Sequence, residues 1–386
     1  MISNGISKLD LKRRNRMQIL RLLRRNGPTS RIDIAREIGI TKAAVTIITN
    51  EMIQDGILYE KGEQRTPEAR ATRGRKKILL DICATYKMDM GIVLEGQNLY
   101  AGVSTLWGEV VEKQTVPVAI GASREEIVTQ MEDLYRQLIY KNDLKPEQIT
   151  GLGICISPRF FDTLHIKRCV QPDYSDFEKY IQKFVHVPFL FGTLSEGAAI
   201  AEVDYWQHKT VPADDIMLIR CAETLEGAVI IGQELYRGAS GRVLHIPEPD
   251  RSAVEKALWE KAGEVFSAER TPNLWRLTDG NIGRLRYILR EGRTFECDKP
   301  IQNLLEEFVR ARASNIPLAA ELYDPGKILL FAAHPGEKWI AETIRKLLAE
   351  QLPGYTVELC RLEERCLFLA GAALATREFF GNRGGY

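Results

Sequence analysis

Residues 189–202 read FLFGTLSEGAAIAE, the pattern of a β-strand that turns directly into an α-helix. An apolar run ends at Gly192, small polar residues follow, and alanines then dominate. In an α/β protein such a turn lies at the carboxyl end of a strand, where ligands bind and acidic side chains act. The residue after Thr193 is Leu194, whose side chain cannot accept a proton. The turn predicts an α/β fold and raises the question of whether its site catalyses a reaction.

Strand and helix patterns alternate on both sides of this turn, from Tyr86 to near the end of the chain. Short apolar runs predict strands, and the amphipathic stretch 123–142 predicts a helix. Such alternation favours an α/β fold in two lobes. The stretches with a strand pattern are 88–94, 99–106, 109–118, 151–157, 187–192, 216–222, 226–238 and 327–333.

The composition is that of an ordinary soluble globular protein, with 45% apolar and 27% charged residues in a chain of 386. This length predicts two or three domains. No apolar run approaches the roughly 20 residues of a membrane span, and the first residues lack the apolar core of a signal peptide. Seven cysteines without a CxxC pair favour reduced thiols over disulfides or a zinc site. We therefore expect a cytoplasmic protein that does not associate with membranes.

The net charge of +1 conceals two oppositely charged parts. Residues 1–80 contain 18 Lys and Arg against 8 Asp and Glu, a net charge of +10. Residues 81–386 contain 35 Lys and Arg against 44 Asp and Glu, a net charge of −9. A basic segment on an acidic body predicts that the basic segment binds a polyanion such as DNA and that the body does not.

Three helix patterns fill the basic segment. Residues 10–26 predict an amphipathic helix, residues 30–39 a second helix capped by Ser30, and residues 41–56 a third helix capped by Thr41. Two helices joined by a short turn that contains glycine make a helix-turn-helix. A three-helix packing module is the alternative, but it has no need of such a high positive charge.

A wing is predicted after the third helix. Residues 57–62 and 75–82 have strand patterns, and the polar, charged stretch 63–74 lies between them. Arg73 and Arg75 flank a glycine in a pattern that suits insertion into a minor groove, where the negative potential attracts arginine. A solvated run of charge is the alternative interpretation of these two arginines.

The third helix of such a module enters the major groove with its first residues nearest the base edges. Lys42 suits a phosphate or guanine, and Asn50 suits adenine or a phosphate. Ile47 could contact a thymine methyl group, or it could pack in the core. Ser30 and Arg31 lie at a helix N-terminus, which suits phosphate contact. The candidate DNA-binding residues are Ser30, Arg31, Thr41, Lys42, Ala43, Thr46, Ile47, Asn50, Arg73 and Arg75.

Three stretches of the body are similar to the ROK family, which unites repressors of sugar metabolism with sugar kinases of the actin/hexokinase-like fold. GAVIIGQELYRGASG at 227–241 resembles the family's strand, turn and Gly-Ala-Ser-Gly loop. The stretch 188–202 resembles its Asn-Asp-Ala-Asn hinge, and 315–331 resembles the helix and strand before its adenosine-site glycines. The resemblance implies a winged helix-turn-helix followed by a two-lobed actin/hexokinase-like (ribonuclease H-like) ROK body.

The positions that match the family's kinase motifs carry other residues. The hinge Asn-Asp, whose Asp takes a proton from the sugar hydroxyl, is replaced by Thr193 and Leu194. The phosphate-loop Asp-x-Gly is replaced by Val93 and Glu95, and a glutamate repels a triphosphate. The adenosine-site glycine pair is replaced by alanines at 332–333. The resemblance therefore implies a protein that is not an enzyme.

The sugar-binding and metal-binding stretch of the family also differs. LHIPE at 244–248 stands where the family has Gly-Glu-Ile-Gly-His, so His245 replaces the sugar-binding Glu and Glu248 replaces the metal-binding His. The family's cysteine-rich zinc loop is missing, and we expect neither a metal nor a cofactor. For a histidine without precedent at this position, a satisfied polar residue is the favoured alternative to a ligand. The candidate effector-binding residues are Arg159, Thr193, Ser195, Glu196, His245 and Glu248.

These features together predict a DNA-binding transcriptional regulator, a repressor, whose catalytically dead body senses an effector and forms dimers. One alternative is a ROK sugar kinase with an accessory DNA-binding head, and another is a dimerisation body without an effector. The expected partners are a double-stranded DNA operator, a sugar or sugar derivative, and a second copy in a homodimer or tetramer. The expected domains are 1–82 (winged helix), 83–200 (first lobe, completed by a C-terminal helix at about 365–386) and 201–364 (second lobe).

Overall fold

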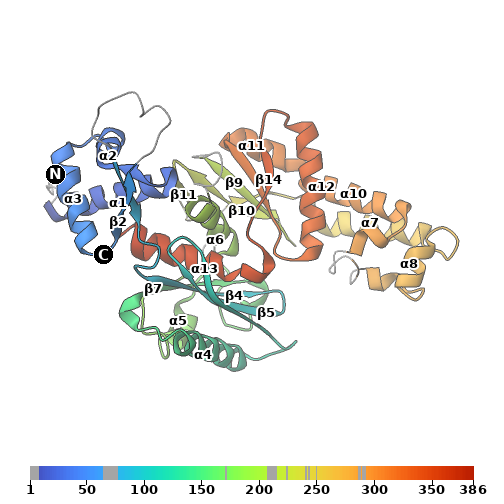
Figure 1. Ribbon diagram of the computed structural model, residues 1–386. Coiled ribbons are helices and arrows are strands. Elements are labelled where there is room, and N and C mark those ends of the chain that lie inside the picture. Colours follow the sequence, from blue (N-terminus) through green and yellow to red (C-terminus); the bar gives the residue numbers. More distant parts are fainter. Residues whose placement is uncertain are drawn as a thin grey trace. The chain divides into compact units, whose positions relative to one another are not determined.

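The computed structural model describes residues 8–63, 77–169, 172–206, 215–222, 225–239, 241, 244–248, 250–285, 288 and 293–386. The chain divides into two compact units (Figure 1). Unit 1 comprises Met1–Lys167, Asp173–Pro212 and Phe368–Tyr386, and unit 2 comprises Arg168–Pro172 and Ala213–Leu367. No helix in the described part of the chain is long and apolar enough to cross a membrane.

The first part of unit 1 is a winged helix of three helices and three strands; the sequence predicted the three helices and two of the strands, but not β1. Its strands form a sheet in the order β1-β3-β2, in which β3 pairs antiparallel with both neighbours. The wing between β2 and β3 lies outside the described residues. The elements are α1 (Lys8–Asn26), β1 (Thr29–Ser30), α2 (Arg31–Ile38), α3 (Lys42–Gln54), β2 (Leu58–Glu63) and β3 (Ile78–Ile82).

Short-range signals define the helix-turn-helix. Ser30 caps α2 by accepting a hydrogen bond from the backbone N–H of Asp33, and Thr41 caps α3 in the same way from Ala44. Gly39 ends α2 with a φ of 70°, a left-handed conformation that glycine adopts without strain. The side chains of Ser30 and Thr41 thus satisfy backbone N–H groups at the starts of α2 and α3, and Gly39 allows the chain to leave α2.

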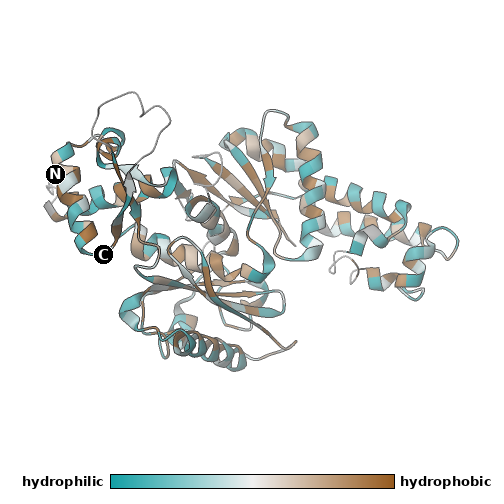
Figure 2. Ribbon diagram, in the orientation of Figure 1, coloured by the Kyte–Doolittle hydropathy of each residue, from teal (hydrophilic) through white to brown (hydrophobic). Residues whose placement is uncertain are grey.

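The rest of unit 1 is built on a five-stranded sheet in the order β6-β5-β4-β7-β8. β4 pairs antiparallel with β5 and parallel with β7, and β7 pairs parallel with β8. Much of this sheet is brown in Figure 2, the colour of hydrophobic residues. The elements are β4 (Met88–Glu95), β5 (Asn98–Thr105), β6 (Val110–Pro117), α4 (Arg124–Lys141), β7 (Ile149–Ile156), α5 (Ser175–Ile181), β8 (Phe189–Gly192), α6 (Leu194–Ala201) and α13 (Phe368–Ala375).

The two faces of this sheet are covered by different helices (Figure 1). Met90, Ile92 and Leu94 of β4 point into a core with α4 and α5. Gly91, on the other face because side chains alternate along a strand, meets α13. A Cβ atom there would lie 1.8 Å from the carbonyl oxygen of Phe368, so only glycine lets α13 lie this close to the sheet.

Two helices of unit 1 continue beyond their regular ends as wider π-helical turns. α6 continues as η4 (Glu202–Trp206), and α13 continues as η10 (Thr376–Gly381). The two helices pack directly on each other, and a Cβ atom at Gly197 of α6 would lie 2.4 Å from the carbonyl oxygen of Ala370. This contact joins the hinge region to the last residues of the chain.

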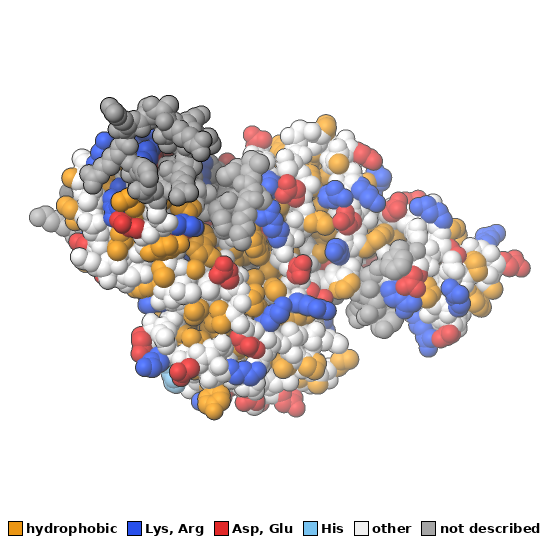
Figure 3. Space-filling view, viewed as in Figure 1, with side chains coloured by type: hydrophobic (Ala, Val, Ile, Leu, Met, Phe, Trp, Pro, Cys, Tyr) orange, Lys and Arg blue, Asp and Glu red, His pale blue; other side chains and the backbone are white. Residues whose placement is uncertain are grey.

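Unit 2 contains a six-stranded sheet and five helices among its described residues. The sheet follows the order β11-β10-β9-β13-β14, and β12 also pairs with β10. Helices α7, α8 and α10 share a separate apolar core, and both signs of charge are interspersed on their surface (Figure 3). The elements are β9 (Ile216–Cys221), β10 (Leu225–Ile231), β11 (Glu234–Tyr236), β12 (Leu244–His245), α7 (Arg251–Val265), α8 (Pro272–Leu277), α10 (Lys299–Arg312), α11 (Ile316–Tyr323), β13 (Lys327–Phe331), α12 (Pro335–Gln351) and β14 (Val357–Leu359).

Candidate nucleic-acid interface and effector-site residues

The recognition helix α3 has one buried face and one exposed face. Its buried residues include Val45, Ile48 and Met52, which pack in the core of the winged helix. Ile47 is 62% exposed, so the alternative of core packing is wrong for this residue. A large apolar side chain that projects from a polar helix face is available for contact with a thymine methyl group. The exposed face carries Lys42, Ala43, Thr46, Ile47 and Asn50.

The partly exposed side chain of Arg31 contacts this helix and its neighbours. Its Nε donates to Thr49 Oγ1 at 3.1 Å, its Nη2 donates to Asn50 Oδ1 at 3.0 Å, and its Nη1 pairs with Glu60 of β2 at 3.0 Å. One guanidinium thus ties α2, α3 and the wing strand together, which fixes the orientation of α3. Asn50 Oδ1 is already engaged, so the amide N–H groups are the part of Asn50 that remains for DNA.

The other candidate DNA-binding residues have different surroundings. Ser30 is 2% exposed and its hydroxyl donates to Asp33 Oδ2 at 2.5 Å, so its side chain serves the helix cap. Thr41 is exposed at the start of α3 and caps it. Arg73 and Arg75 lie outside the described residues.

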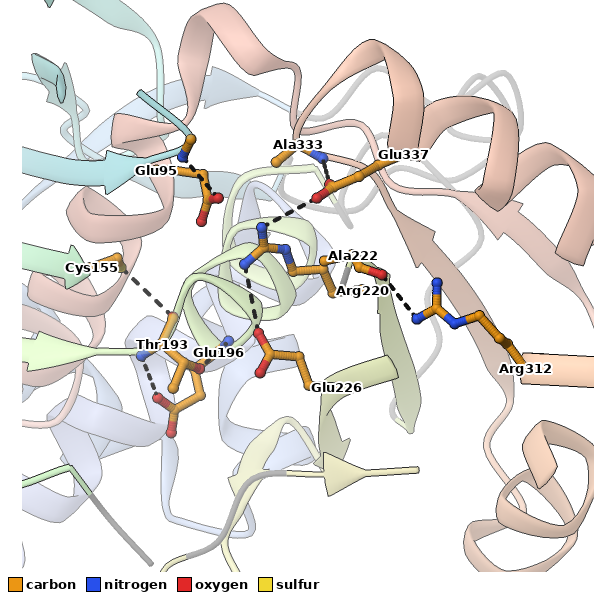
Figure 4. Close-up of polar contacts among 11 residues, drawn as sticks. Glu95, Cys155, Thr193, Glu196, Arg220, Ala222, Glu226, Arg312, Ala333 and Glu337 are labelled. Carbon is orange, nitrogen blue, oxygen red and sulfur yellow. Dashed lines mark hydrogen bonds and ion pairs between the residues drawn. The ribbon is translucent and has the colours of Figure 1, made fainter. Parts of the chain in front are cut away.

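Thr193 and Glu196 form a reciprocal cap at the start of α6 (Figure 4). Thr193 Oγ1 accepts from the backbone N–H of Glu196 at 3.1 Å, and Glu196 Oε2 accepts from the backbone N–H of Thr193 at 2.8 Å. Ser195 is 1% exposed, and no hydrogen-bond partner for its Oγ lies among the described residues. Leu194 is buried beside them. The turn therefore contains polar groups that can bind a ligand, while the residue directly after Thr193 is a leucine, which cannot accept a proton.

Cys155 is buried next to this turn. Its thiol donates to the carbonyl oxygen of Thr193 at 3.7 Å. Burial raises the pKa of the Cys155 thiol, and the nearby carboxylates of Glu196 and Glu95 raise it further. A thiol held in its protonated form is inert. Arg159 is exposed, and its guanidinium lies 5.3 Å from the ring centre of Phe160.

Unit 2 holds the remaining two candidate effector residues. His245 is exposed on the short strand β12. Glu248 accepts from the backbone N–H of Leu225 at 2.7 Å and from Arg312 Nε at 2.5 Å. The Glu248 carboxylate is thus engaged in the structure of unit 2, while His245 is available to solvent. Within the described parts of the chain, no group of three or more His, Cys, Asp or Glu residues could hold a metal ion.

Unit 2 contains an internal ion cluster that was not predicted from the sequence (Figure 4). Arg220 is 4% exposed and pairs with Glu226 at 3.6 Å and with Glu337 at 3.4 Å. Glu337 Oε2 also accepts from the backbone N–H of Ala333 at 2.6 Å, so this carboxylate occupies the positive N-terminus of α12. A glutamate at the third position of a helix that begins with proline was the available signal.

Comparison with known proteins agrees with this architecture. Residues 12–59 match the family described as winged helix-turn-helix DNA-binding. A crystal structure of a ROK family transcriptional regulator, a homolog of the E. coli MLC protein, superimposes with a TM-score of 0.69 over 97% of each chain at 17% identity. The ROK family glucokinase from Streptomyces griseus superimposes with a TM-score of 0.57 over 75% of this chain and 99% of its own, also at 17% identity. The fold is a winged helix-turn-helix followed by the two-lobed ROK body, as expected.

The chain is also similar in sequence to two curated repressors. It is 24% identical over 235 residues to the xylose repressor of Caldicellulosiruptor bescii, which covers 60% of this chain and 57% of that protein. It is 23% identical over 236 residues to the xylose repressor of Bacillus subtilis, covering 60% and 59%. The matched region thus spans less than two thirds of these relatives.

Proposed function

We propose that the protein is a DNA-binding transcriptional repressor whose ROK body binds a small-molecule effector and does not phosphorylate it. The exposed face of α3 carries this proposal, because Lys42, Thr46 and Asn50 project from a helix that Arg31 holds in one orientation. Side chains in a fixed orientation can read base edges in the major groove without a further ordering cost. The net charge of +10 in residues 1–80 supplies attraction to phosphates.

Two features support a body without kinase activity. Leu194 stands at the start of α6, where the resemblance to the family implies a catalytic carboxylate, and a leucine cannot take a proton. Glu95, which is 5% exposed at the end of β4, stands where the resemblance implies the glycine of the phosphate loop, and a glutamate repels a triphosphate. Both substitutions oppose phosphoryl transfer, one at the base and one at the anion site.

A sugar is the proposed class of effector. The similar proteins from Caldicellulosiruptor bescii and Bacillus subtilis are named xylose repressors, and D-xylose is therefore the first candidate. Within unit 1 the cap formed by Thr193 and Glu196, together with the buried hydroxyl of Ser195, offers donors and acceptors for sugar hydroxyl groups. Within unit 2, His245 and Glu248 stay candidate effector-binding residues, and His245 is the more accessible of the two.

We propose that the active form is a homodimer, or a tetramer built from dimers. One winged helix contacts few bases, whereas two copies related by a twofold axis read two half-sites of a pseudo-palindromic operator. The contacts between copies are part of the proposal, and analytical ultracentrifugation of the full-length protein with and without DNA measures them.

The proposal is tested by selecting duplexes from a randomised DNA pool with the full-length protein. We expect enrichment of a pseudo-palindromic sequence, and a reduced affinity for it when D-xylose is added. In parallel, the protein is incubated with ATP and either D-xylose or D-glucose, and we expect no ADP. The proposed repressor function fails if no sequence is enriched, and phosphorylation of either sugar establishes the rival function of a kinase with a DNA-binding head.

A further inference from the structure

The helix that begins at the hinge ends at the DNA-binding head. α6 starts at the cap formed by Thr193 and Glu196, and its continuation η4 contains Asp204. The eight residues of α6 and the five of η4 span roughly 20 Å at 1.5 Å per helical residue. η4 contacts α1, the first helix of the winged helix. A single helical segment of unit 1 thus joins the candidate effector residues to the head.

Asp204 lies in a buried cluster of charges at this junction. Its carboxylate pairs with Arg377 of η10, with Oδ2 3.1 Å from Nε and Oδ1 2.5 Å from Nη2. Its Oδ2 also lies 4.0 Å from Nη1 of Arg24 in α1. Burial alone would raise the pKa of Asp204, but the charges of Arg377 and Arg24 hold it below its ordinary value. Asp204 is therefore charged, and it faces cations from two other elements.

Arg24 forms an ion pair with Asp204, and its charge also acts on the buried carboxyl group of Asp89. Its guanidinium is 7% exposed and lies 5.7 Å from the ring centre of Trp107 and 5.9 Å from that of Phe380. Neither Nη1 nor Nη2 has a hydrogen-bond partner among the described residues. An uncompensated buried charge is strongly destabilising. At 4.0 Å the contact with Asp204 is longer than a hydrogen bond, so a displacement of about 1 Å in η4 would either form that bond or weaken the compensation.

A second set of contacts fastens α1 to the chain segment that follows Arg377. Arg16 of α1 is 1% exposed, and its Nε donates to the carbonyl oxygen of Gly384 at 2.8 Å. Arg13 Nη2 donates to the carbonyl oxygen of Asn382 at 3.0 Å. Because α13 packs on α6, and η10 continues α13, a shift of α6 reaches α1 both through Asp204 and through this C-terminal segment.

We propose that Asp204 is a positioning residue through which a change at the N-terminus of α6 alters the placement of the DNA-binding head. The inference rests on the proposed function, because it supplies the physical connection between the effector residues and DNA. A sugar hydroxyl that donates a hydrogen bond to Thr193 Oγ1 or to the Glu196 carboxylate competes with the backbone N–H groups of the reciprocal cap and weakens it. The helix then shifts along its axis, and the distance from Asp204 to Arg24 changes.

The test uses a substitution at each end of the helix in the full-length protein. Thr193→Ala removes the cap and mimics its disturbance by a ligand, and Asp204→Asn removes the charge at the other end with little change in shape. Asp176→Asn is the matched control, because Asp176 pairs with Lys179 at 2.8 Å on the surface of α5. Arg24→Met is a second variant that leaves the pair between Asp204 and Arg377 intact.

Hydrogen exchange of peptides from α1 and α3 is the first readout, because it requires no DNA. We expect Thr193→Ala to change their exchange rates by about 5-fold or more in the otherwise wild-type protein and with Asp176→Asn. With Asp204→Asn or Arg24→Met, the same cap substitution should change them less than about 2-fold. Circular dichroism and melting curves identify any variant that has lost its fold. If Asp204→Asn unfolds the protein, the comparison is made with Arg24→Met.

Affinity for the selected duplex is the second readout. The effect of Thr193→Ala on Kd should follow the same pattern across the four backgrounds. The inference is overturned if the cap substitution acts equally with and without Asp204 and Arg24, or if it does not affect the head at all. If no duplex is selected, the proposed function fails, while the exchange measurement still decides whether Asp204 transmits the change.

Discussion

At the scale of single residues, Asp89 is the buried acid that the sequence did not single out. It is 0% exposed, and Thr376 Oγ1 donates a hydrogen bond to its Oδ2. Burial raises the pKa of Asp89 to about 7, although the Thr376 hydroxyl and the charge of Arg24 oppose the rise. This residue makes the stability of unit 1 dependent on pH near neutrality.

The sign of this dependence follows from proton binding. Between pH of about 4 and 7 the unfolded chain has released the Asp89 proton and the native protein retains it, so the free energy of unfolding falls as pH rises. Relative to the wild type, Asp89→Asn should gain on the order of 3 kcal/mol between pH 5 and pH 8. Urea unfolding measures the difference. Asp176→Asn should show no such gain, and parallel curves for Asp89→Asn and wild type would contradict the assignment.

Also at this scale, two residues on the exposed face of α3 should have distinguishable roles. Asn50→Ala should weaken binding to the selected duplex and relax its base preference by roughly 1–3 kcal/mol, because a base-edge contact is lost. Lys42→Ala should weaken binding to selected and random duplexes alike and reduce the salt slope by about 1, because a phosphate contact is lost. Titrations at several salt concentrations separate the two. Equal losses on both duplexes for Asn50→Ala would reduce it to a phosphate contact.

At the scale of elements, the close approach of α13 to the sheet determines the architecture of unit 1. Gly91→Ala should destabilise the protein by about 3 kcal/mol or more, because the new Cβ would meet the carbonyl oxygen of Phe368 at 1.8 Å. Gly263→Ala is the matched control, since no atom lies within 4 Å of a Cβ at that position in α7. It should stabilise by about 0.5–1 kcal/mol through helix propensity. Melting curves of the two variants measure the difference. Equal shifts in melting temperature for Gly91→Ala and Gly263→Ala would argue against the close packing of α13 on the sheet.

At the scale of the whole molecule, the winged helix shares its core with the end of the chain. Phe380 and Leu106 pack with α1 and α3, and the centre of the Tyr386 ring lies 4.1 Å from the Arg16 guanidinium. The winged helix is therefore not an independently packed domain, because residues outside it contribute to its core. It is completed by residues that follow it by more than three hundred positions, as the hydrogen bond from Arg16 to Gly384 demonstrates.

Deletion of residues 382–386 should therefore destabilise the head. It removes the partners of Arg13 and Arg16 and leaves the buried guanidinium of Arg16 with Asp55 alone, which should cost about 1–3 kcal/mol. Hydrogen exchange in α1 should become faster, and DNA affinity should fall. Tyr386→Phe keeps the ring over Arg16 and should behave like the wild type. Unchanged exchange in the deletion variant would refute a structural role for the C-terminal segment.

The sequence by itself determined the local elements and the exposed face of α3. Helix caps and stops act over three or four residues, so they can be recognised from the sequence without knowledge of the fold. This holds for the caps at Ser30 and Thr41 and for the stop at Gly39. The periodicity that buries Val45 and Ile48 exposes Thr46 and Asn50 for the same reason. The sequence also showed that the residue after Thr193 in the hinge is Leu194, whose side chain cannot accept a proton.

Tertiary structure alone decided which distant groups meet. Nothing near Arg31 in the sequence predicts that it holds Thr49, Asn50 and Glu60 at once, and nothing near Glu337 predicts Arg220. Asp204 and Arg24 lie on different helices, and they meet because η4 packs against α1. Hydrogen bonds within a turn depend on nearest neighbours, whereas buried ion pairs depend on how whole helices pack, and that packing is encoded over the entire chain.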